Sequence, residues 1–378
     1  LAEFFNAFNV AGVYFKDIEA NGADAATPGA GAAFEFSGAD LRLVGLGGGR
    51  LKALLARDLD YLVRQSPDGI AAASRGLGPA GDILVNGPLR SLIVPENQRT
   101  KLKTLEWRDI SFAGLMAYGL KGEWPPVSAR NLINLGTLRI TDAETFIGNK
   151  RFSLVPETTI SAMEFAWLAP SKLRAVTRGG VYDFTAYVDD AEREAIAELE
   201  SRKLDRVRGD SDFAYDWNAD KGGAVLSAGF DSTGLADVDL DLSLKGLELK
   251  KIEAARAAGA AQPVADLALL ESFSLTIADE QLLDAFYALS ALESGGSAKD
   301  IRAATPAMMR LGKIELEEDA PRLAGYVDAA AEFLEDGGTL EIRAEPETPV
   351  PLKTIGASVA GGPDAIADAI DLTVTRKE

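Results

Sequence analysis

The sequence predicts a β-rich α+β fold, in which one or more long, curved, mostly antiparallel sheets, or a partly open barrel, carry several amphipathic helices. Many short segments alternate apolar and polar residues with the period of two that is typical of half-buried strands. Only a few segments place apolar residues at helical spacing. With 378 residues, 47% of them hydrophobic, the chain has enough apolar material for a large core.

The clearest predicted strand covers residues 238–245. Valine or leucine occupies every second position from Val238 to Leu244, and polar residues stand between them. After Gly246 the phase changes by one residue, because Leu247 and Leu249 now carry the apolar face. Such a slip at a glycine predicts a bulge or a tight bend in a continuing strand.

Other segments show the same alternation. They are residues 34–36, 41–43, 138–140, 163–167, 182–188, 213–217, 273–277, 340–342 and 370–374. Because such strands have one wet and one dry face, they favour an antiparallel sheet.

Two helices are predicted in the first two thirds of the chain. The first lies near 51–64, between the glycines 47–49 and Pro67. Its apolar stripe consists of Leu51, Leu54, Leu55, Leu59, Leu62 and Val63. The second lies near 190–204, where Asp189 or Asp190 is the expected N-cap.

Two further helices are predicted beyond residue 280. One carries the apolar residues Leu282, Leu283, Phe286 and Leu289. The next begins at Ser297, a residue that favours the N-cap position. Pro306 is expected to kink or end this helix, because proline lacks the backbone N–H that a helix interior uses.

The best-marked helix is predicted between Asp319 and Gly337. Pro321 stands in its first turn, and Gly337 is the expected C-terminal stop. Its apolar stripe runs from Leu323 to Leu334 and is expected to pack against a sheet.

A change of composition predicts two regions in the chain. Residues 1–253 are expected to form a β-rich domain that includes the helices near 51–64 and 190–204. Residues 262–378 form a mixed helix and strand region, which completes the same sheet or stands beside it. The Ala-rich stretch 254–261, closed by Pro263, is the expected boundary.

The absence of histidine and cysteine limits the chemistry of this chain. Without them there is no Ser-His-Asp triad, no Cys-His pair and no His-bearing zinc site. Pairs of carboxylates are the remaining route to hydrolysis, but 58 acidic residues single out no pair. We therefore predict a protein that is not an enzyme and uses no cofactor.

Two motifs are candidate ligand sites. The glycines at 45 and 47–49 are followed by Arg50 where a dinucleotide fingerprint needs glycine, and no Lys-Ser/Thr follows for a P-loop, so a plain turn is expected. A candidate calcium cluster consists of Asp210, Asp212, Asp216 and Asp220. An EF-hand loop beginning at Asp210 would need glycine where the chain has Tyr215, so these acids are interpreted as the wet face of a strand, and no metal site is predicted.

The net charge of −19 makes nucleic acid an unexpected partner, because the surface repels phosphate. The lack of cysteine fits both the cytoplasm and an oxidising compartment.

The C-terminal half resembles a family of uncharacterised alphaproteobacterial cell-envelope proteins. The resemblance covers roughly residues 180–378 and rests on four short segments. They are residues 215–217, 331–334, 339–342 and 349–352; the alternating run through Leu244 follows the first, and the turn at Gly337 follows the second. The resemblance implies export to the periplasm, and it carries no functional residue.

Two functions remain. In the first, the protein binds a lipid or another apolar ligand in a β-lined groove that helices cover, without catalysis. The candidate groove residues are Leu55, Leu59, Leu62, Leu282, Leu283, Phe286 and Leu289. In the second, the protein is a structural or self-assembling envelope component, which binds a membrane surface, an envelope protein or itself. The sequence leaves the oligomeric state open.

Overall fold

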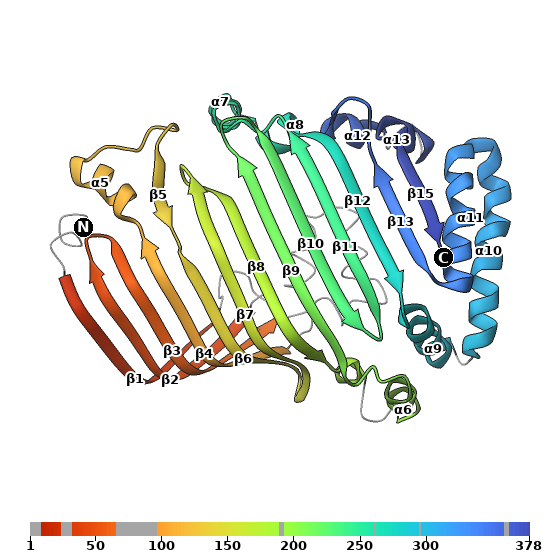
Figure 1. Ribbon diagram of the computed structural model, residues 1–378, viewed down its shortest axis with the longest axis horizontal. Helices are drawn as coiled ribbons and strands as arrows, with labels where there is room; N and C mark the ends of the chain where they lie inside the picture. Colours follow the sequence, from red (N-terminus) through yellow and green to blue (C-terminus); the bar gives the residue numbers. More distant parts are fainter. Residues whose placement is uncertain are drawn as a thin grey trace. The chain divides into compact units, whose positions relative to one another are not determined.

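The computed structural model describes residues 9–23, 32–65, 97–188, 193–260, 262–294, 296–358 and 363–378 (Figure 1). The predicted α+β, β-rich class is confirmed, because 53% of the structure is strand and 29% is helix. The neighbouring strands whose residue-by-residue pairing is defined run antiparallel, as the alternating pattern predicts.

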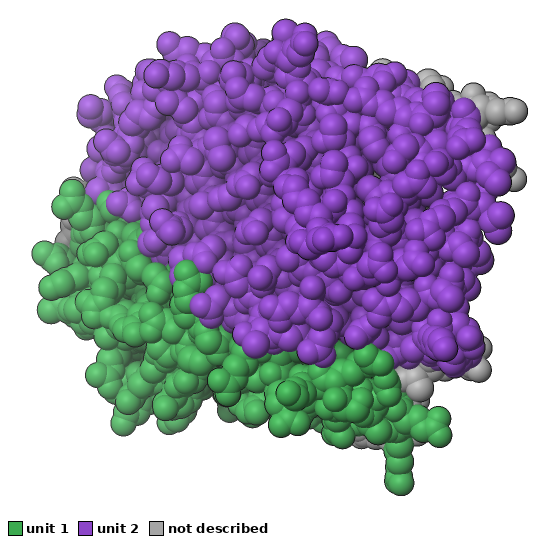
Figure 2. Space-filling model, turned by 45° about the vertical axis from the view of Figure 1, so that its right-hand side comes forward, with its two compact units in different colours: residues 1–111, 136–159, 177–208 green, residues 112–135, 160–176, 209–378 purple. Residues whose placement is uncertain are grey.

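The chain forms two compact units that do not follow the expected division at residues 254–261. Unit 1 contains residues 1–111, 136–159 and 177–208, and unit 2 contains residues 112–135, 160–176 and 209–378. Figure 2 shows unit 1 in green and unit 2 in purple. Two long strands, β7 (Lys150–Ala166) and β8 (Ala169–Tyr182), contribute residues to both units.

Unit 1 is built from long antiparallel strands. They are β1 (Asn9–Ala23), β2 (Ala32–Gly47), β3 (Arg50–Gln65), β4 (Asn97–Ser111) and β6 (Thr137–Ile147), which pair in this order. Gly48 and Gly49 form the two-residue connection between β2 and β3, and both have positive φ angles of 54° and 73°. The glycine run is therefore the turn of a β-hairpin, since tight hairpin turns favour positive φ.

The helix predicted near 51–64 is wrong, because these residues form strand β3. Asp58 has a φ of 51°, and pairing with β2 breaks between Arg57 and Asp60. This break in pairing interrupts the alternation of apolar and polar residues along β3. The leucines on either side of it then stand three or four residues apart, which is the spacing expected of a helix. Buried Ala53 and Ala56 also lie three residues apart, so the burial does not alternate simply along the strand.

The second predicted helix of this region is confirmed as α6 (Arg193–Ser201), within the expected range 190–204. The candidate caps Asp189 and Asp190 lie outside the described residues. The strand expected at 182–188 is wrong beyond Tyr182. There Asp183 accepts a hydrogen bond from the Thr185 backbone N–H (2.9 Å) and begins the 3-10 turn η2 (Phe184–Tyr187).

Unit 2 combines shorter strands with most of the helices. Its further strands are β5 (Arg130–Asn134), β9 (Val207–Asn218), β10 (Gly223–Thr233), β11 (Ala236–Lys245), β12 (Leu269–Asp279), β13 (Thr339–Ala344), β14 (Val350–Pro351) and β15 (Leu372–Lys377). The first two residues of β9 belong to unit 1, and the rest of the strand, from Gly209, belongs to unit 2. Its helices are α5 (Ala113–Lys121), α7 (Leu249–Ala257), α8 (Pro263–Leu267), α9 (Leu282–Ser294), α10 (Ala298–Asp319), α11 (Pro321–Asp336), α12 (Leu352–Ser358) and α13 (Pro363–Ala369). Strands β9 to β13 follow one another in order, and β15 then pairs with β13.

The bend predicted at Gly246 is confirmed, but the strand does not continue beyond it. Strand β11 ends at Lys245, with a shift of register between Ser243 and Leu244. Gly246 has a φ of 81°, and an added Cβ would lie 2.4 Å from the carbonyl oxygen of Leu267. Only glycine fits this combination of backbone angle and close approach. The chain then enters α7 at Leu249.

The helices predicted in the C-terminal region are confirmed. Ser297 caps α10 by accepting a hydrogen bond from the Asp300 backbone N–H (3.1 Å). Pro306 lies inside α10 and does not end it. Helix α11 begins at Pro321 and ends at Gly337 as predicted, although Asp319 belongs to α10 and does not cap α11.

Helix α11 packs on strands β13 and β15, so the expected contact between its apolar stripe and a sheet is confirmed. Phe333 of this helix forms a buried cluster with Leu283 and Tyr287 of α9. Ile277 of β12 and Leu340 of β13 pack against the same cluster. Aromatic and aliphatic burial of this size is the main stabilising contribution here.

Candidate ligand pocket

The residues predicted to line a groove are divided between the two units. Leu55, Leu59 and Leu62 lie on strand β3 of unit 1, whereas Leu282, Leu283, Phe286 and Leu289 lie on helix α9 of unit 2. Leu283 is buried in the cluster with Phe333, and Phe286 is 49% exposed. The side chain of Leu289 lies outside the described residues. Neither group lines the apolar pocket described below.

Unit 2 contains an apolar pocket with a volume of about 610 Å³. Three of the four tryptophans of the chain line it, together with Tyr215. The complete lining is Trp124, Trp167, Leu168, Ala169, Pro170, Tyr215, Trp217, Leu247, Leu249, Ile252, Glu253, Arg256 and Val264. We call this the tryptophan pocket.

The aromatic rings reach the pocket from three separate parts of the chain. Tyr215 and Trp217 stand two residues apart on β9, so the strand presents both side chains on one face. Trp167 lies in the turn between β7 and β8 with a φ of 56°. Trp124 follows α5 and is 72% exposed. The pocket therefore has one deeply buried ring, Trp217, and one open to solvent.

The segment after Gly246 forms another wall of the pocket. Leu247, Leu249 and Ile252 line the pocket and belong to the same buried cluster as Trp217. Because the chain bends out of the sheet at Gly246, these side chains are carried over the end of β9 instead of continuing along β11. The bend is thus a structural requirement of the pocket.

The indole N–H groups of the two inner tryptophans are already bonded within the protein. Trp217 donates to the carbonyl oxygen of Leu247 (2.8 Å), and Trp167 donates to that of Pro125 (3.0 Å). Their polar atoms are thus engaged with the backbone, and mainly carbon surface remains for a ligand. Burial raises the pKa of Tyr215, and the neighbouring Asp216 carboxylate adds to that rise.

Two charged residues complete the lining. Glu253 and Arg256 stand one turn apart on α7 and form an ion pair at 2.7 Å. The Glu253 side chain is only 18% exposed, whereas that of Arg256 is 61% exposed. The pocket wall therefore carries a half-buried carboxylate beside an exposed guanidinium.

Of the four acidic residues considered as calcium ligands, Asp210, Asp212 and Asp216 lie on β9 and Asp220 lies in the turn after it. Within the described ranges, no group of three or more acidic residues is arranged to hold a metal ion. Asp216 faces Lys172 (3.8 Å), and Asp220 pairs with Arg130. These side chains are accounted for by ion pairs at the surface.

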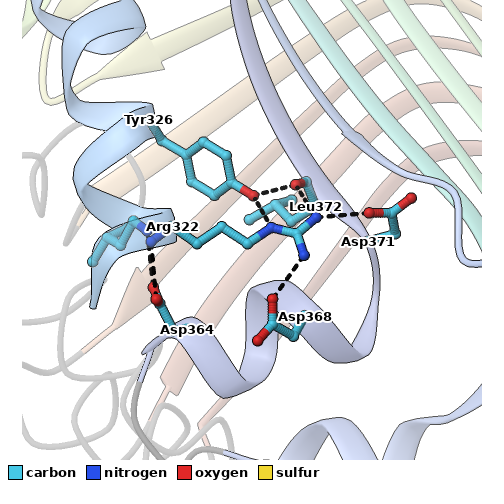
Figure 3. A network of polar contacts seen from close by, with 7 residues as sticks. Arg322, Tyr326, Asp364, Asp368, Asp371 and Leu372 are labelled. Atoms are coloured by element: carbon cyan, nitrogen blue, oxygen red, sulfur yellow. Dashed lines mark hydrogen bonds and ion pairs between the residues drawn. The ribbon is translucent and has the colours of Figure 1, made fainter. Parts of the chain in front are cut away.

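A second polar cluster surrounds Arg322 on α11 (Figure 3). Its guanidinium donates to Asp368 (2.7 Å) and to Asp371 (2.6 Å), and Asp364 accepts from the backbone N–H groups of Arg322 (2.9 Å) and Leu323 (2.8 Å). The carboxylates raise the pKa of Arg322 above its usual range. This network joins the start of α11 to α13 and β15. The Arg322 guanidinium is therefore already bonded to carboxylates of the protein.

Helices that span a membrane need a long apolar stretch, and none of the helices in the described part of the chain meets that requirement.

Comparison with known proteins gives little guidance on function. A family model described only as an uncharacterized protein matches residues 229–377. No curated protein matches the chain. The matched segment includes the α7 wall of the tryptophan pocket but not Trp124, Trp167 or Trp217.

Sequence reasoning did not find this pocket. The alternation at 213–217 correctly placed Tyr215 and Trp217 on one strand face. Nothing in the local pattern connects them with Trp124 and Trp167. The useful signal was the combination of clustered aromatic residues on β9 with the phase slip at Gly246.

Proposed function

We propose that the protein binds a lipid or another apolar ligand in the tryptophan pocket, without catalysis. The observation that carries this proposal is the convergence of Trp124, Trp167, Tyr215 and Trp217 on one cavity. Its volume of about 610 Å³ falls within the range of about 300–1,000 Å³ that is typical of small-molecule sites.

The chemistry of the lining favours an apolar ligand over a strongly polar one. A sugar or a nucleotide needs several polar groups with free hydrogen-bonding capacity, and the inner indoles have used theirs on the backbone. An alkyl chain gains about 0.8 kcal/mol for each CH₂ group that it buries.

We place this function in the periplasm or cell envelope, as the resemblance of residues 180–378 implies. The absence of cysteine suits an oxidising compartment. A fractionation of the source organism with an antibody to this chain tests the location, and recovery with cytoplasmic markers would contradict it.

Binding is tested with N-phenylnaphthylamine, an uncharged dye whose fluorescence rises in apolar surroundings. We expect saturable binding to the full chain. Val264→Trp is designed to fill the pocket from its exposed side, because Val264 lines it and is 49% exposed. This variant should fold normally and lose most of the binding.

The matched control is Val225→Trp, because Val225 is 50% exposed on β10 and does not line the pocket. It should bind the dye like the unmodified protein. Absence of saturable binding to the unmodified chain, or equal binding by both tryptophan variants, would refute the proposal.

A second function, self-assembly, is supported by the exposed face of α10. Met308, Leu311 and Ile314 are 63%, 66% and 64% exposed, and they stand three residues apart on this helix. Exposed Ala304 and Ala307 lie on the same face. A contiguous apolar stripe of this kind is unusual on a monomer surface.

The charges beside the stripe favour a second copy as the partner. Lys299 and Glu317 are both exposed and lie 18 residues apart, which is five full helical turns. They therefore flank the stripe on the same side, one near each end. In an antiparallel pair of α10 helices, Lys299 of each copy approaches Glu317 of the other.

Sedimentation velocity over a range of concentrations tests this second function. We expect reversible dimers, loss of the dimer in Lys299→Glu, and recovery in the double variant Lys299→Glu with Glu317→Lys. A monomer at every concentration would refute self-assembly and leave ligand binding unaffected.

A further inference from the structure

The geometry points to a lipid with a zwitterionic phosphocholine headgroup as the ligand of the tryptophan pocket. This inference rests on the proposed function and narrows it to one headgroup class. Its basis is the meeting of aromatic rings, one carboxylate and one guanidinium on the wall of an otherwise apolar cavity.

Aromatic rings and a carboxylate together favour a bulky organic cation. The pocket contains four aromatic side chains, and the faces of tryptophan and tyrosine attract quaternary ammonium groups. Glu253 adds a full negative charge from a side chain that is only 18% exposed. A trimethylammonium group gains from both while losing less hydration than a primary amine, because its surface is methyl groups.

Arg256 supplies the complementary site for a phosphate. Its guanidinium lies 2.7 Å from Glu253 and is the one cationic side chain in the described lining. Guanidinium groups bind phosphate through two parallel hydrogen bonds. The Arg256 side chain is 61% exposed, so water weakens its attraction to Glu253 and a phosphate can compete for the guanidinium.

The charge of the whole protein disfavours ligands that are only anionic. With a net charge of −19, the surface repels fatty acids and acidic lipids over long range. A zwitterion avoids this repulsion and still matches the adjacent carboxylate and guanidinium. The two charges of the headgroup thus correspond to the two charges of the pocket wall.

The test uses four detergents with the same dodecyl chain, each below its critical micelle concentration. They are dodecylphosphocholine, dodecyltrimethylammonium, dodecyl sulfate and dodecyl maltoside, and their binding is measured by displacement of N-phenylnaphthylamine. We expect dodecylphosphocholine to bind about tenfold more tightly than dodecyl sulfate or dodecyl maltoside. The affinity for dodecyltrimethylammonium should lie between that for dodecylphosphocholine and that for the other two detergents.

Variants of the α7 side chains show which residue recognises the phosphate and which recognises the trimethylammonium group. Arg256→Ala should weaken dodecylphosphocholine about fivefold and leave dodecyltrimethylammonium unchanged or tighter. Glu253→Gln should weaken both. Lys251→Ala is the matched control, because Lys251 is a cation on the same helix that pairs with Glu248 (2.8 Å) and does not line the pocket.

The outcomes separate this inference from the function on which it rests. If dodecyl maltoside or dodecyl sulfate binds as tightly as dodecylphosphocholine, or if Arg256→Ala behaves like Lys251→Ala, the headgroup inference is wrong and the apolar pocket stands. If none of the four detergents displaces the dye and the dye itself does not bind, the proposed function is wrong as well.

Discussion

Strands β2 and β3 of unit 1 bury other kinds of side chain than the two clusters of unit 2 described above. In unit 1, the strands β2 and β3 bury the aliphatic residues Ala53, Ala56 and Leu59 and the charged Asp40. In unit 2, the two clusters described above bury large rings, among them Trp217, Tyr287 and Phe333. Strands β2 and β3 thus differ from the two clusters of unit 2 in the size of the side chains that they bury.

Cross-strand ion pairs are prominent in unit 1. Asp40 of β2 stands opposite Arg57 of β3 and accepts a hydrogen bond from its Nε (2.6 Å). Arg99 of β4 forms a two-bond pair with Asp60 of β3, one bond measuring 2.6 Å. Further pairs between neighbouring strands are Arg64–Glu35, Lys103–Asp142, Arg139–Glu157 and Arg151–Glu144.

Unit 2 also contains a buried carboxylate, Glu341, which pairs with Lys377 of β15 at 2.8 Å. The difference between β2 and β3 of unit 1 and the two clusters of unit 2 therefore lies in the size of the buried apolar side chains. A large ring buried among other rings contributes more than an exposed ion pair. The comparison teaches that truncating a buried ring in the clusters of unit 2 should cost more than removing an ion pair from β2 and β3, and that pH should act through buried carboxylates such as Asp40.

The largest effect is expected for Phe333→Ala in unit 2. Phe333 is 5% exposed and packs against Leu283 and Tyr287, so its loss leaves a cavity that costs about 3–5 kcal/mol. The free energy of unfolding is measured by urea titration. The matched control is Phe286→Ala, because this phenylalanine is 49% exposed. Equal urea midpoints for the two variants would show that the buried ring of Phe333 stabilises unit 2 no more than the exposed ring of Phe286.

A smaller loss, about 2–3 kcal/mol, is expected for Gly246→Ala. An alanine there must adopt a φ of 81° with its Cβ 2.4 Å from the Leu267 carbonyl oxygen. Gly259→Ala separates these two costs, because Gly259 has a φ of 87° but no atom within 4 Å of an added Cβ. Both variants are measured by the thermal midpoint of unfolding and by hydrogen exchange of β11 and α7. If Gly259→Ala destabilises as much as Gly246→Ala, the close approach contributes nothing.

The smallest effect is expected for Asp40 and depends on pH. Hydrogen bonds from Arg57 hold the pKa of Asp40 below its usual value, against the effect of burial. In the unfolded chain this carboxyl titrates near its ordinary pKa of about 3.9. The stabilisation is therefore complete above that pH and is lost as the pH falls through the lower pKa of the folded state.

Asp40→Asn provides the reference for this titration. The difference in unfolding free energy between the unmodified protein and Asp40→Asn should shrink as the pH falls from 6 to 3, and hydrogen exchange locates the change on β2 and β3. A difference that stays constant across this range would show that the Asp40–Arg57 pair does not stabilise unit 1 through its charge.

The sequence by itself determined the features that depend on near neighbours in the chain. The β-rich class followed from alternation, and α11 followed from Pro321 and Gly337, because these residues have fixed preferences at helix ends. Ser297 marked the start of α10 for the same reason. The bend at Gly246 was also predictable, since the phase of the apolar residues changes there.

Only the tertiary structure decided the features that depend on distant contacts. Residues 51–64 carry helical spacing, yet pairing with β2 and β4 makes them a strand, and the break near Asp58 explains the misleading period. The tryptophan pocket needs Trp124, Trp167 and Trp217 from three separate segments. Local periodicity shows which side of a segment is buried, but it does not show which distant segments come together, and that is why the tryptophan pocket could not be predicted from the sequence.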